Sequence, residues 1–296
     1  KDKLFFFLGY EESEDVRPSL WGTSDSNATN KWDTSGATMD AIAKHMLDTY
    51  GYTAGSYNSI TFPTTQEQLL VKLNGNINDD HRAELVYQVT EDSYYANYDS
   101  SGRPTFSNNY YEIPPETERV TVNIYSDWTD RFSTRIRFSD RFFEQDANSG
   151  DGGYGGLMPE FHIYEAGDII YVGSDRYRGH NLIEVDQQLM SIKGNLDFDN
   201  HYITFGYETD SSSIYNSFIN RYTGELNFSG LDNFYAGNYN RVEVFAVSVD
   251  AGGPYSLVRD DPALPAARFD IDETIMYLQD EWQVNDTLSI AFGVRH

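Results

Sequence analysis

Three arginines occur in one short segment at positions where they could bind an anion together. Arg131, Arg135 and Arg137 all have the same parity in the sequence, so an extended strand would point them to one side. A guanidinium group binds a carboxylate or a phosphate through paired hydrogen bonds. The segment therefore predicts either a contact surface for an anionic partner or a polar surface whose charges are balanced by neighbouring side chains.

A group of tyrosines is the second candidate for ligand contacts. Aromatic side chains supply much of the binding energy at many interfaces. Tyrosines in a predicted loop also serve packing, so both interpretations remain open. The five residues are Tyr94, Tyr95, Tyr98, Tyr110 and Tyr111.

The familiar catalytic and metal-binding motifs are missing from the sequence. The six histidines show no H-E-x-x-H spacing, and neither a G-x-S-x-G nor a P-loop motif occurs. Gly150, Gly152 and Gly155 match G-x-G-x-x-G by letter but fall in a predicted loop rather than between a strand and a helix. The stretch 146–151 resembles the start of a calcium loop, although Leu157 stands where such a loop has glutamate. We expect a protein that is not an enzyme and needs no cofactor; calcium binding by the loop stays open.

Composition narrows the class of protein. The chain of 296 residues is 15% aromatic and rich in Tyr, Phe, Asn, Asp and Gly, which favours strands joined by turns. It has no cysteine, so disulfides and thiolate metal sites are excluded. A net charge of −26 repels nucleic acid. Because no apolar run approaches the roughly 18 residues of a membrane-spanning helix, the protein is either soluble or crosses a membrane as strands.

Alternating apolar and polar residues predict about nine antiparallel strands. Leu69, Val71 and Leu73, for example, alternate with polar residues. The last hairpin contains Ile275–Leu278, which is apolar on both faces and cannot be oriented from the pattern. The expected strands lie near 4–11, 68–77, 82–90, 120–124, 131–139, 190–196 and 203–207, with two more between about 275 and 294.

The connections between the expected strands alternate strictly in length. Four tight turns alternate with four long segments, near 12–65, 93–116, 145–184 and 210–268. The first long segment contains an expected helix between residues 37 and 50, since Met39, Ile42 and Met46 fall on one helical face. All tight turns would lie at one end of the sheet, as in an up-and-down outer-membrane β-barrel with long extracellular loops. Aromatic residues gather at that end, as in a membrane-interface girdle: Trp128, Phe132, Phe198, Tyr202 and Trp282.

Several segments resemble one family of outer-membrane proteins. The opening Lys1–Phe7 resembles the start of the barrel in Oar-like TonB-dependent receptors. Tyr277–Trp282 followed by Phe292–Arg295 resembles a strand pair shared widely by TonB-dependent receptors. Gly173–Asn181 and His201–Glu208 are similar to mid-barrel segments of the Oar-like subgroup.

The resemblance implies energy-coupled uptake of a scarce ligand across the bacterial outer membrane, such as a siderophore, a peptide or a glycan. Export is not excluded. Residues 1–296 would be part of a larger barrel domain, with the plug domain, the TonB box and the C-terminal strands absent. The implied partners are the TonB complex through that plug, outer-membrane lipid and a small-molecule or peptide ligand. Arg131, Arg135 and Arg137 would then face the lumen and contact the plug or an anionic ligand.

Two other classes of protein compete with this interpretation. A soluble or surface-attached β-sandwich that binds carbohydrate or protein would bring its apolar faces together. A secreted hydrolase would bring carboxylates or histidines together in one cleft. The barrel instead predicts an apolar band on the outside of a single sheet.

Overall fold

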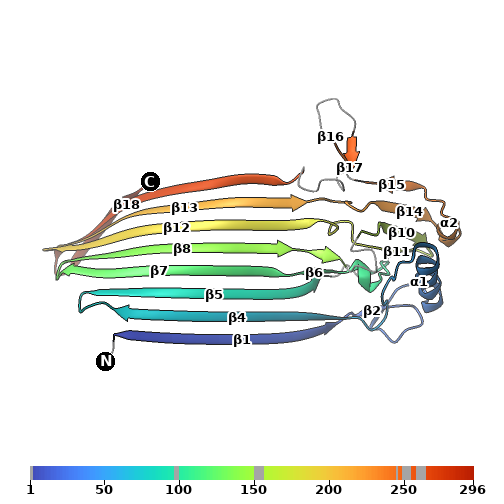
Figure 1. Ribbon diagram of the computed structural model, residues 1–296, viewed down its shortest axis with the longest axis horizontal. Coiled ribbons are helices and arrows are strands. Elements are labelled where there is room, and N and C mark those ends of the chain that lie inside the picture. Colours follow the sequence, from blue (N-terminus) through green and yellow to red (C-terminus); the bar gives the residue numbers. More distant parts are fainter. Residues whose placement is uncertain (1–2, 97–99, 150–156, 245, 249–254, 258–264) are drawn as a thin grey trace.

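The computed structural model describes every residue except 1–2, 97–99, 150–156, 245, 249–254 and 258–264. Its main feature is one large antiparallel sheet whose nine long strands follow each other in chain order (Figure 1). This up-and-down order confirms the predicted fold class. The nine strands are β1 (Leu4–Pro18), β4 (Thr61–Asn76), β5 (His81–Ala96), β7 (Pro115–Thr129), β8 (Phe132–Asp146), β12 (Asn181–Phe198), β13 (His201–Phe218), β18 (Ala267–Asn285) and β19 (Leu288–Arg295).

The strand register divides the side chains of this sheet between two faces. Phe6, Leu73, Leu85, Val122, Phe138 and Met190 lie directly opposite one another across six neighbouring strands. We call the side that they occupy the apolar face. The side chains next to this row along the strands point to the other side of the sheet, which we call the polar face. They form a second row of directly opposed residues: Asn74, Glu84, Asn123, Arg137, Ser191 and Glu208. The register thus keeps the two faces in phase across these neighbouring strands.

The apolar face is not covered by another layer of the chain. Large hydrophobic side chains on it are exposed on strands from both ends of the sheet, which does not favour the alternative β-sandwich, in which such faces meet. A single sheet with an apolar band on one face is what the barrel interpretation predicts. The exposed members of this face include Phe6, Leu8, Leu73, Leu85, Ile124, Ile136, Phe138, Met190, Phe205, Met276, Leu278, Ile290 and Phe292.

All four tight turns lie at one end of the sheet, as predicted (Figure 1). Four aromatic residues lie on the apolar face next to these turns: Trp128, Phe132, Phe198 and Trp282. The indole Nε1 of Trp128 donates a hydrogen bond to Thr134 Oγ1 at 2.8 Å. Tyr202 differs, because it alternates with Ile203 and therefore falls on the polar face. The predicted group of aromatics thus keeps four of its five members on the apolar side.

The strands extend further from the turns than the sequence pattern predicted. β8 continues to Asp146 and β13 to Phe218, so the long connections are shorter than expected. The alternation fades there because the apolar face becomes acidic, while backbone pairing continues. The change is marked by a glutamate row, six directly opposed residues on six strands: Glu12, Glu67, Glu91, Glu116, Glu144 and Glu184.

The long connections fold together at the end of the sheet opposite the turns (Figure 1). They form a compact subdomain, which we call the cap, rather than separate loops. Its mixed sheet has the order β11 (Asp168–Val172), β10 (Glu160–Glu165), β14 (Glu225–Ser229) and β15 (Arg241–Glu243), with β10 and β14 parallel. The cap also contains β2 (Trp21–Gly22), β3 (Asn30–Lys31), α1 (Gly36–Tyr50), η1 (Ser107–Asn109) and α2 (Leu231–Tyr235). Two short strands, β6 (Tyr111–Ile113) and β9 (Asn148–Ser149), extend the large sheet beside β5, while β16 (Ala246–Ser248) and β17 (Tyr255–Leu257) form a separate hairpin.

Helix α1 confirms the helix expected from the sequence. Ser35 caps its first turn by accepting from the Thr38 backbone N–H at 3.2 Å, and Gly51 ends it in the left-handed conformation with φ of 67°. The predicted face of Met39, Ile42 and Met46 is fully buried. It packs into a core with residues from other connections, among them Phe106, Phe161, Ile163, Ile170, Phe228 and Phe234.

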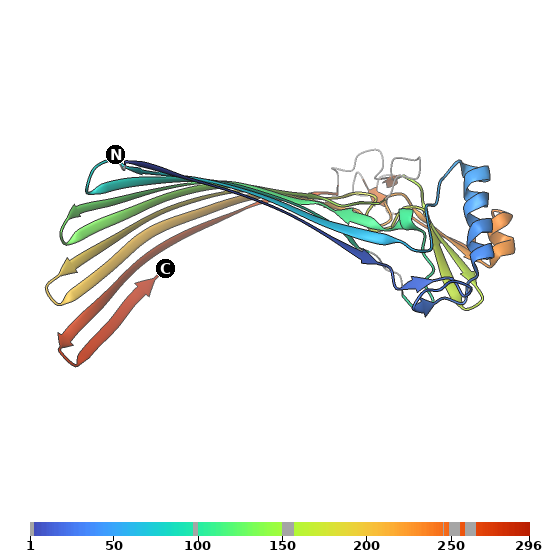
Figure 2. The ribbon, with the colours of Figure 1, turned by 90° about the horizontal axis from the view of Figure 1, so that it is seen from below.

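The large sheet is twisted and curved but open (Figure 2). Strands β1 and β19 stand at opposite ends of the strand order and do not pair with each other. No helix in the described part of the chain is long and apolar enough to cross a membrane. The fold is therefore a section of barrel wall with a folded cap at one end.

Replacing Ile42 with alanine is expected to loosen the cap without disturbing the large sheet. Ile42 is fully buried in the cap core, and truncating such a side chain costs about 3 kcal/mol. Leu47 on the same helix is 54% exposed, so Leu47→Ala should cost less than about 0.5 kcal/mol. Hydrogen exchange of the β10 and β14 amides measures the difference. Equal effects of the two substitutions would show that α1 does not pack through the face described.

Candidate functional site

The polar face carries a broad hollow near the tight turns. It has a volume of about 950 Å³, and basic side chains from neighbouring strands contribute to its wall. Most of its lining residues on the strands, such as Arg82, Tyr125 and Lys193, belong to the polar face. Its basic lining residues are Lys3, His81, Arg82, Arg135 and Lys193, accompanied by polar residues and by Asp79, Asp80 and Asp127.

Two of the three predicted arginines lie together on this face. Arg135 and Arg137 both project from β8, and Arg135 Nη2 donates to Asn123 Oδ1 at 3.0 Å. The Arg135 guanidinium also lies 5.2 Å from the ring centre of Tyr125. Arg131 is instead in the turn between β7 and β8, where it is exposed and 3.8 Å from Asp199. The structure thus separates Arg131 from the other two.

Further cations extend the set beyond what the sequence suggested. Arg119 on β7 lies directly opposite Arg141 on β8, and Arg135 lies directly opposite Lys193 on β12. With Arg137 these residues form what we call the basic strip. Within the described part of the chain, none of the five forms an ion pair with a carboxylate. The strip is a local excess of positive charge in a protein whose net charge is −26.

The predicted tyrosine group is divided by the fold. Tyr94 and Tyr95, at the end of β5, are 40% and 39% exposed and line a second hollow of about 610 Å³ with Trp21 and Phe62. Tyr110 is buried and packs edge-on against Phe62 at 5.1 Å. Tyr111 is buried beneath the Arg178 guanidinium at 4.5 Å. Tyr94 and Tyr95 are therefore the exposed members of the group among the described residues.

Some residues of interest fall outside the described part of the chain. Tyr98 is one of them, as are Gly150, Gly152 and Gly155. The acidic stretch 146–151 is described only up to Ser149.

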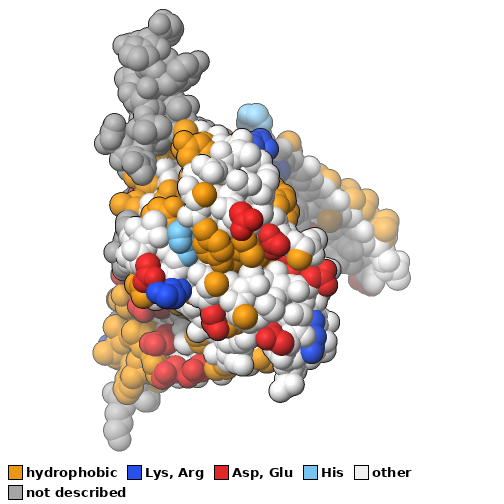
Figure 3. All heavy atoms as spheres, turned by 90° about the vertical axis from the view of Figure 1, so that its right-hand side faces the viewer, with side chains coloured by type: hydrophobic (Ala, Val, Ile, Leu, Met, Phe, Trp, Pro, Cys, Tyr) orange, Lys and Arg blue, Asp and Glu red, His pale blue; other side chains and the backbone are white. Residues whose placement is uncertain are grey.

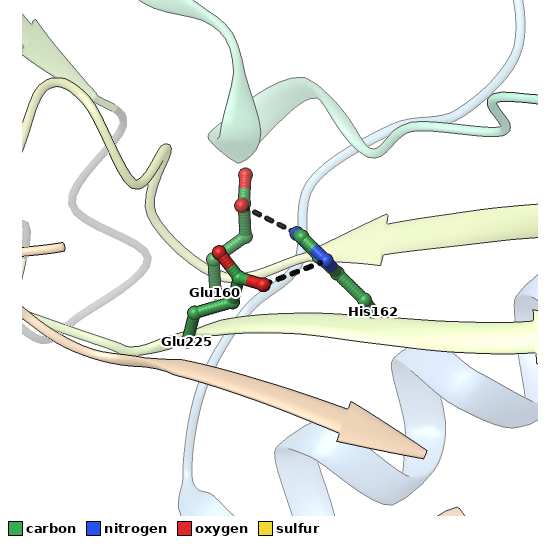
Figure 4. Close-up of side chains that lie close together, drawn as sticks. All are labelled: Glu160, His162 and Glu225. Atoms are coloured by element: carbon green, nitrogen blue, oxygen red, sulfur yellow. Dashed lines mark hydrogen bonds and ion pairs between the residues drawn. The ribbon is translucent and has the colours of Figure 1, made fainter. Parts of the chain in front are cut away.

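The cap contains a buried cluster that the sequence did not reveal. Glu160 and His162 alternate on β10 and so share one side of the small sheet, while Glu225 lies directly opposite Glu160 on β14. The exposed fractions of the three side chains are 4% or less. His162 Nε2 is 2.6 Å from Glu160 Oε2, and Nδ1 is 3.3 Å from Glu225 Oε1 (Figure 4). The imidazole therefore stands between two carboxylates.

Side chains from other connections hold the outer oxygens of these carboxylates. Asn109 Nδ2 donates to Glu160 Oε1 at 2.8 Å. Arg176 Nη1 and Arg221 Nε donate to Glu225 Oε2 at 3.0 and 2.9 Å. Three residues before Arg176, Gly173 has a φ of 102° and lies so close to the Pro159 carbonyl that no side chain would fit there. We call Glu160, His162, Glu225, Arg176, Arg221 and Asn109 the cap network.

The charges in the cap network shift the pKa values of its members. Burial alone would raise the pKa of Glu225, but the hydrogen bond from Asn227 and the nearby His162 and Arg176 outweigh it and lower the value to about 2. Burial likewise opposes the charge of Arg176, yet its hydrogen bond to Glu225 and the proximity of Glu160 raise its pKa. Glu225 and Arg176 are thus a firmly charged pair.

Glutamate and histidine also bind metal ions, and one potential ligand atom of each of Glu160, His162 and Glu225 lies within 4.8 Å of the others. The arrangement does not suit a single ion. The two carboxylates approach opposite nitrogens of the imidazole, and two guanidinium groups already contact Glu225. The burial of all three side chains also differs from the open cleft expected of a hydrolase.

Sequence analysis missed this cluster because its signal is weak and non-local. The only local sign is the alternation of Glu160 and His162, which a strand would place on one side. The sequence pattern predicts a loop for this segment, and the pairing of β10 with β14 joins residues far apart in the chain.

Few basic side chains lie on the outer surface of the cap among the residues that the structure describes (Figure 3). Figure 3 shows hydrophobic side chains in the middle of this surface beside a histidine, with scattered Asp and Glu and few Lys or Arg. Leu47 on α1 and Tyr235 on α2 are exposed there to 54% and 38%. The outer surface of the cap therefore carries both apolar and acidic side chains.

Comparison with known proteins identifies the fold but not the family. No protein-family model matches the chain, and no curated protein matches it. The crystal structure of the outer membrane transporter YddB from Escherichia coli superimposes with a TM-score of 0.57 at 14% identity, covering 99% of this chain and 31% of that one. The chain thus spans about a third of the length of YddB and shares the fold of that part.

Two ferric-siderophore receptors also match, with lower scores. The closed form of the ferric-catecholate import receptor Fiu from Escherichia coli K12 gives a TM-score of 0.49 at 8% identity, over 98% of this chain and 40% of that one. BauA, the ferric preacinetobactin receptor from Acinetobacter baumannii, gives 0.44 at 9% identity, over 99% and 37%.

The cap should become more stable in alkaline solution when Asp175 is replaced by asparagine. Asp175 is fully buried, and burial together with the charge of Glu160 raises its pKa from 3.8 to about 7. A raised pKa means that this group favours the folded cap most below pH 3.8 and loses that contribution as the pH rises to about 7. Asp175→Asn removes this loss and should stabilise the cap by about 2 kcal/mol at pH 8.

The measurement is hydrogen exchange of the β10 amides at pH 5 and pH 8, corrected for the intrinsic rate. Asp48→Asn on the exposed side of α1 is the control and should leave the pH dependence unchanged. A destabilised Asp175→Asn variant at pH 8 would show that the cap requires the ionised carboxylate.

Proposed function

We propose that this chain is part of the barrel wall of a TonB-dependent outer-membrane transporter of the Oar-like subgroup. It would take part in energy-coupled uptake of a scarce ligand, such as a siderophore, a peptide or a glycan. The observation that carries the proposal is the exposed apolar face, which continues in phase across the large sheet. So large an uncovered apolar surface needs lipid or another apolar layer against it. The shared fold with part of YddB supports the same interpretation.

The boundaries of the apolar face support a position in the outer membrane. At one end the apolar face terminates at Trp128, Phe198 and Trp282 beside the tight turns, as in an interfacial girdle. At the other end the apolar face terminates at the glutamate row. On each strand the glutamate is six residues, or about 20 Å, from the residue in the row of Leu73, Leu85 and Val122. Directly opposed carboxylates repel one another, so the row belongs in water. The intervening length suits a membrane-crossing strand, which needs roughly 9–11 residues.

The open edges of the sheet support the proposal that further strands complete the barrel. Exposed backbone groups on β1 and β19 would be very costly in lipid unless other strands paired with them. We assign residues 1–296 to a partial barrel domain. Contact with the TonB complex would be made by a plug domain elsewhere in the protein. The cap would lie on the extracellular side, where the long connections gather.

The basic strip would face the lumen and bind an anionic group. Arg135 and Arg137 form this site together with Arg119, Arg141 and Lys193, while Arg131 lies at its rim in the turn. Uncompensated cations on a sheltered wall attract carboxylates or phosphates. Their partner would be an anionic ligand, or acidic residues of the plug. Tyr94 and Tyr95 offer a separate aromatic contact near the cap.

Replacing Ile136 with aspartate in the full-length protein should disrupt its assembly into the outer membrane, whereas Arg135→Ser should not. The two residues are neighbours on β8, but Ile136 lies on the apolar face and Arg135 on the polar face. A carboxylate facing lipid costs roughly 2 kcal/mol, while a lumen residue tolerates exchange. The fraction of heat-modifiable, folded protein in isolated outer membranes measures the effect. Equal tolerance of both substitutions, or native protein in the soluble fraction, would overturn the proposal.

The basic strip is tested with citrate as a tricarboxylate probe. Isothermal titration of the detergent-solubilised full-length protein should show binding that the double variant Arg137→Gln, Arg141→Gln weakens by at least about tenfold, because charged hydrogen bonds are lost. Arg131→Gln is the control and should bind citrate like the unmodified protein. If the strip holds the plug instead, the double variant would leave citrate affinity unchanged and lower the unfolding temperature of the plug.

A further inference from the structure

We propose that His162 is held as a doubly protonated imidazolium between Glu160 and Glu225, and that this buried ion network locks the cap onto the ends of β12 and β13. The inference goes beyond the proposed transport function and does not depend on it. It assigns a conformational role to a histidine that touches neither the lumen nor the apolar face.

The protonation state follows from the hydrogen-bond geometry. Both ring nitrogens of His162 face carboxylate oxygens, at 2.6 Å for Nε2 and 3.3 Å for Nδ1. An ionised carboxylate only accepts hydrogen bonds, and a neutral imidazole donates from one nitrogen only. A neutral ring with its proton on Nε2 would therefore direct the lone pair of Nδ1 toward the Glu225 carboxylate. The imidazolium donates a hydrogen bond to Glu160 and also carries a positive charge beside Glu225, so it suits both carboxylates.

The charges around His162 balance when the ring carries its second proton. Three carboxylates, Glu160, Glu225 and Glu243, face three cations, His162, Arg176 and Arg221. A neutral histidine would leave a negative charge in excess, which is costly in a buried site. A divalent metal ion in place of the proton would leave a positive excess. Only the second proton on His162 makes the charges of these six groups sum to zero.

An aromatic ring and further charged groups surround this inner set of six. The Tyr171 ring lies 4.4 Å from the imidazole, and the Arg103 guanidinium covers the outer side of that ring at 3.8 Å. Asp175 is near Glu160 and is also attracted by Arg178 and Arg103. Arg241 contacts Glu243 but is largely exposed, so water screens its charge.

The position of the network explains why it would act as a lock. Arg176 comes from the segment leading into β12, and Arg221 from the segment leaving β13. The Arg221 N–H donates to the Arg176 carbonyl at 2.5 Å, so the two segments meet where the barrel wall joins the cap. Glu160 and Glu225 belong to the parallel pair at the centre of the small sheet. His162 thus joins the centre of the cap to the strands that support it.

The test uses the full-length protein in detergent and follows hydrogen exchange of β10 and β14, with β13 as the internal reference. His162→Gln should speed exchange in β10 and β14 by roughly 100-fold, since it leaves a buried charge unpaired. The double variant His162→Gln, Glu160→Gln removes one cation and one anion, and should recover much of the protection. Lys44→Gln on the exposed side of α1 is the control and should show no change in β14.

Two further readouts separate this lock from other roles. Nitrogen NMR of the protein with labelled histidine should show protons on both ring nitrogens of His162, and a chelator should leave exchange unchanged. A neutral His162 spectrum, a double variant that exchanges faster than either single variant, or loosening by the chelator would overturn the proposal. Heat-modifiable mobility reports barrel integrity separately, so failure of the lock is distinguishable from failure of the proposed function.

Discussion

The alternation of side chains along a strand is the constraint on which the rest of this structure depends. Because neighbouring strands keep their register, one choice of face at Leu73 fixes the face of Leu85, Val122 and Phe138 in turn. A shift of one residue in any strand would reverse its two faces. One face of the large sheet is therefore apolar and unfavourable in water, and the other is polar and unfavourable in lipid. Such a sheet is stable only at a boundary between the two, or closed around a polar interior.

The same strands change environment along their length. On β8 the apolar face has Ile136 and Phe138 nearer the turns, but Asp140 and Glu144 nearer the cap. Backbone hydrogen bonds between the strands do not depend on whether the side chains are apolar or acidic. The sheet therefore continues past the end of the apolar region. Beyond it, the connections have water on their outside and need a core of their own. They obtain one from α1 and the small sheet, with the cap network buried beside it.

Local patterns in the sequence were sufficient for the long strands and for α1. Alternation, Asn and Asp turns and the spacing of Met39, Ile42 and Met46 are each set by residues close together in the chain. The orientation of Ile275–Leu278 was not predictable, because it depends on which strand pairs with it. The register opposite β19 places Leu278 beside Val294 on the apolar face and Tyr277 beside Arg295 on the polar face.

The cap was beyond prediction for the same physical reason. Its parallel pairing of β10 with β14 and its buried charges unite segments from separate connections, none of which has an apolar pattern strong enough to be recognised alone. The polar residues of those connections were interpreted as loop residues. In the folded protein, Glu160 and Glu225 are polar and buried because each has charged partners within reach.

The distribution of charge shows why net charge is a poor guide to the partner of such a protein. The net charge of −26 suggests attraction to cations. On β8, however, Glu144 belongs to the apolar face and Arg141 to the polar face, although they are close neighbours in the sequence. On β8, alternation thus places Asp140 and Glu144 on the apolar face and Arg135, Arg137 and Arg141 on the polar face. In the proposed barrel, a solute in the lumen would meet the basic strip, whereas the glutamate row would lie across the thickness of the sheet. The charges of the polar face, rather than the net charge of the chain, would then determine the partner.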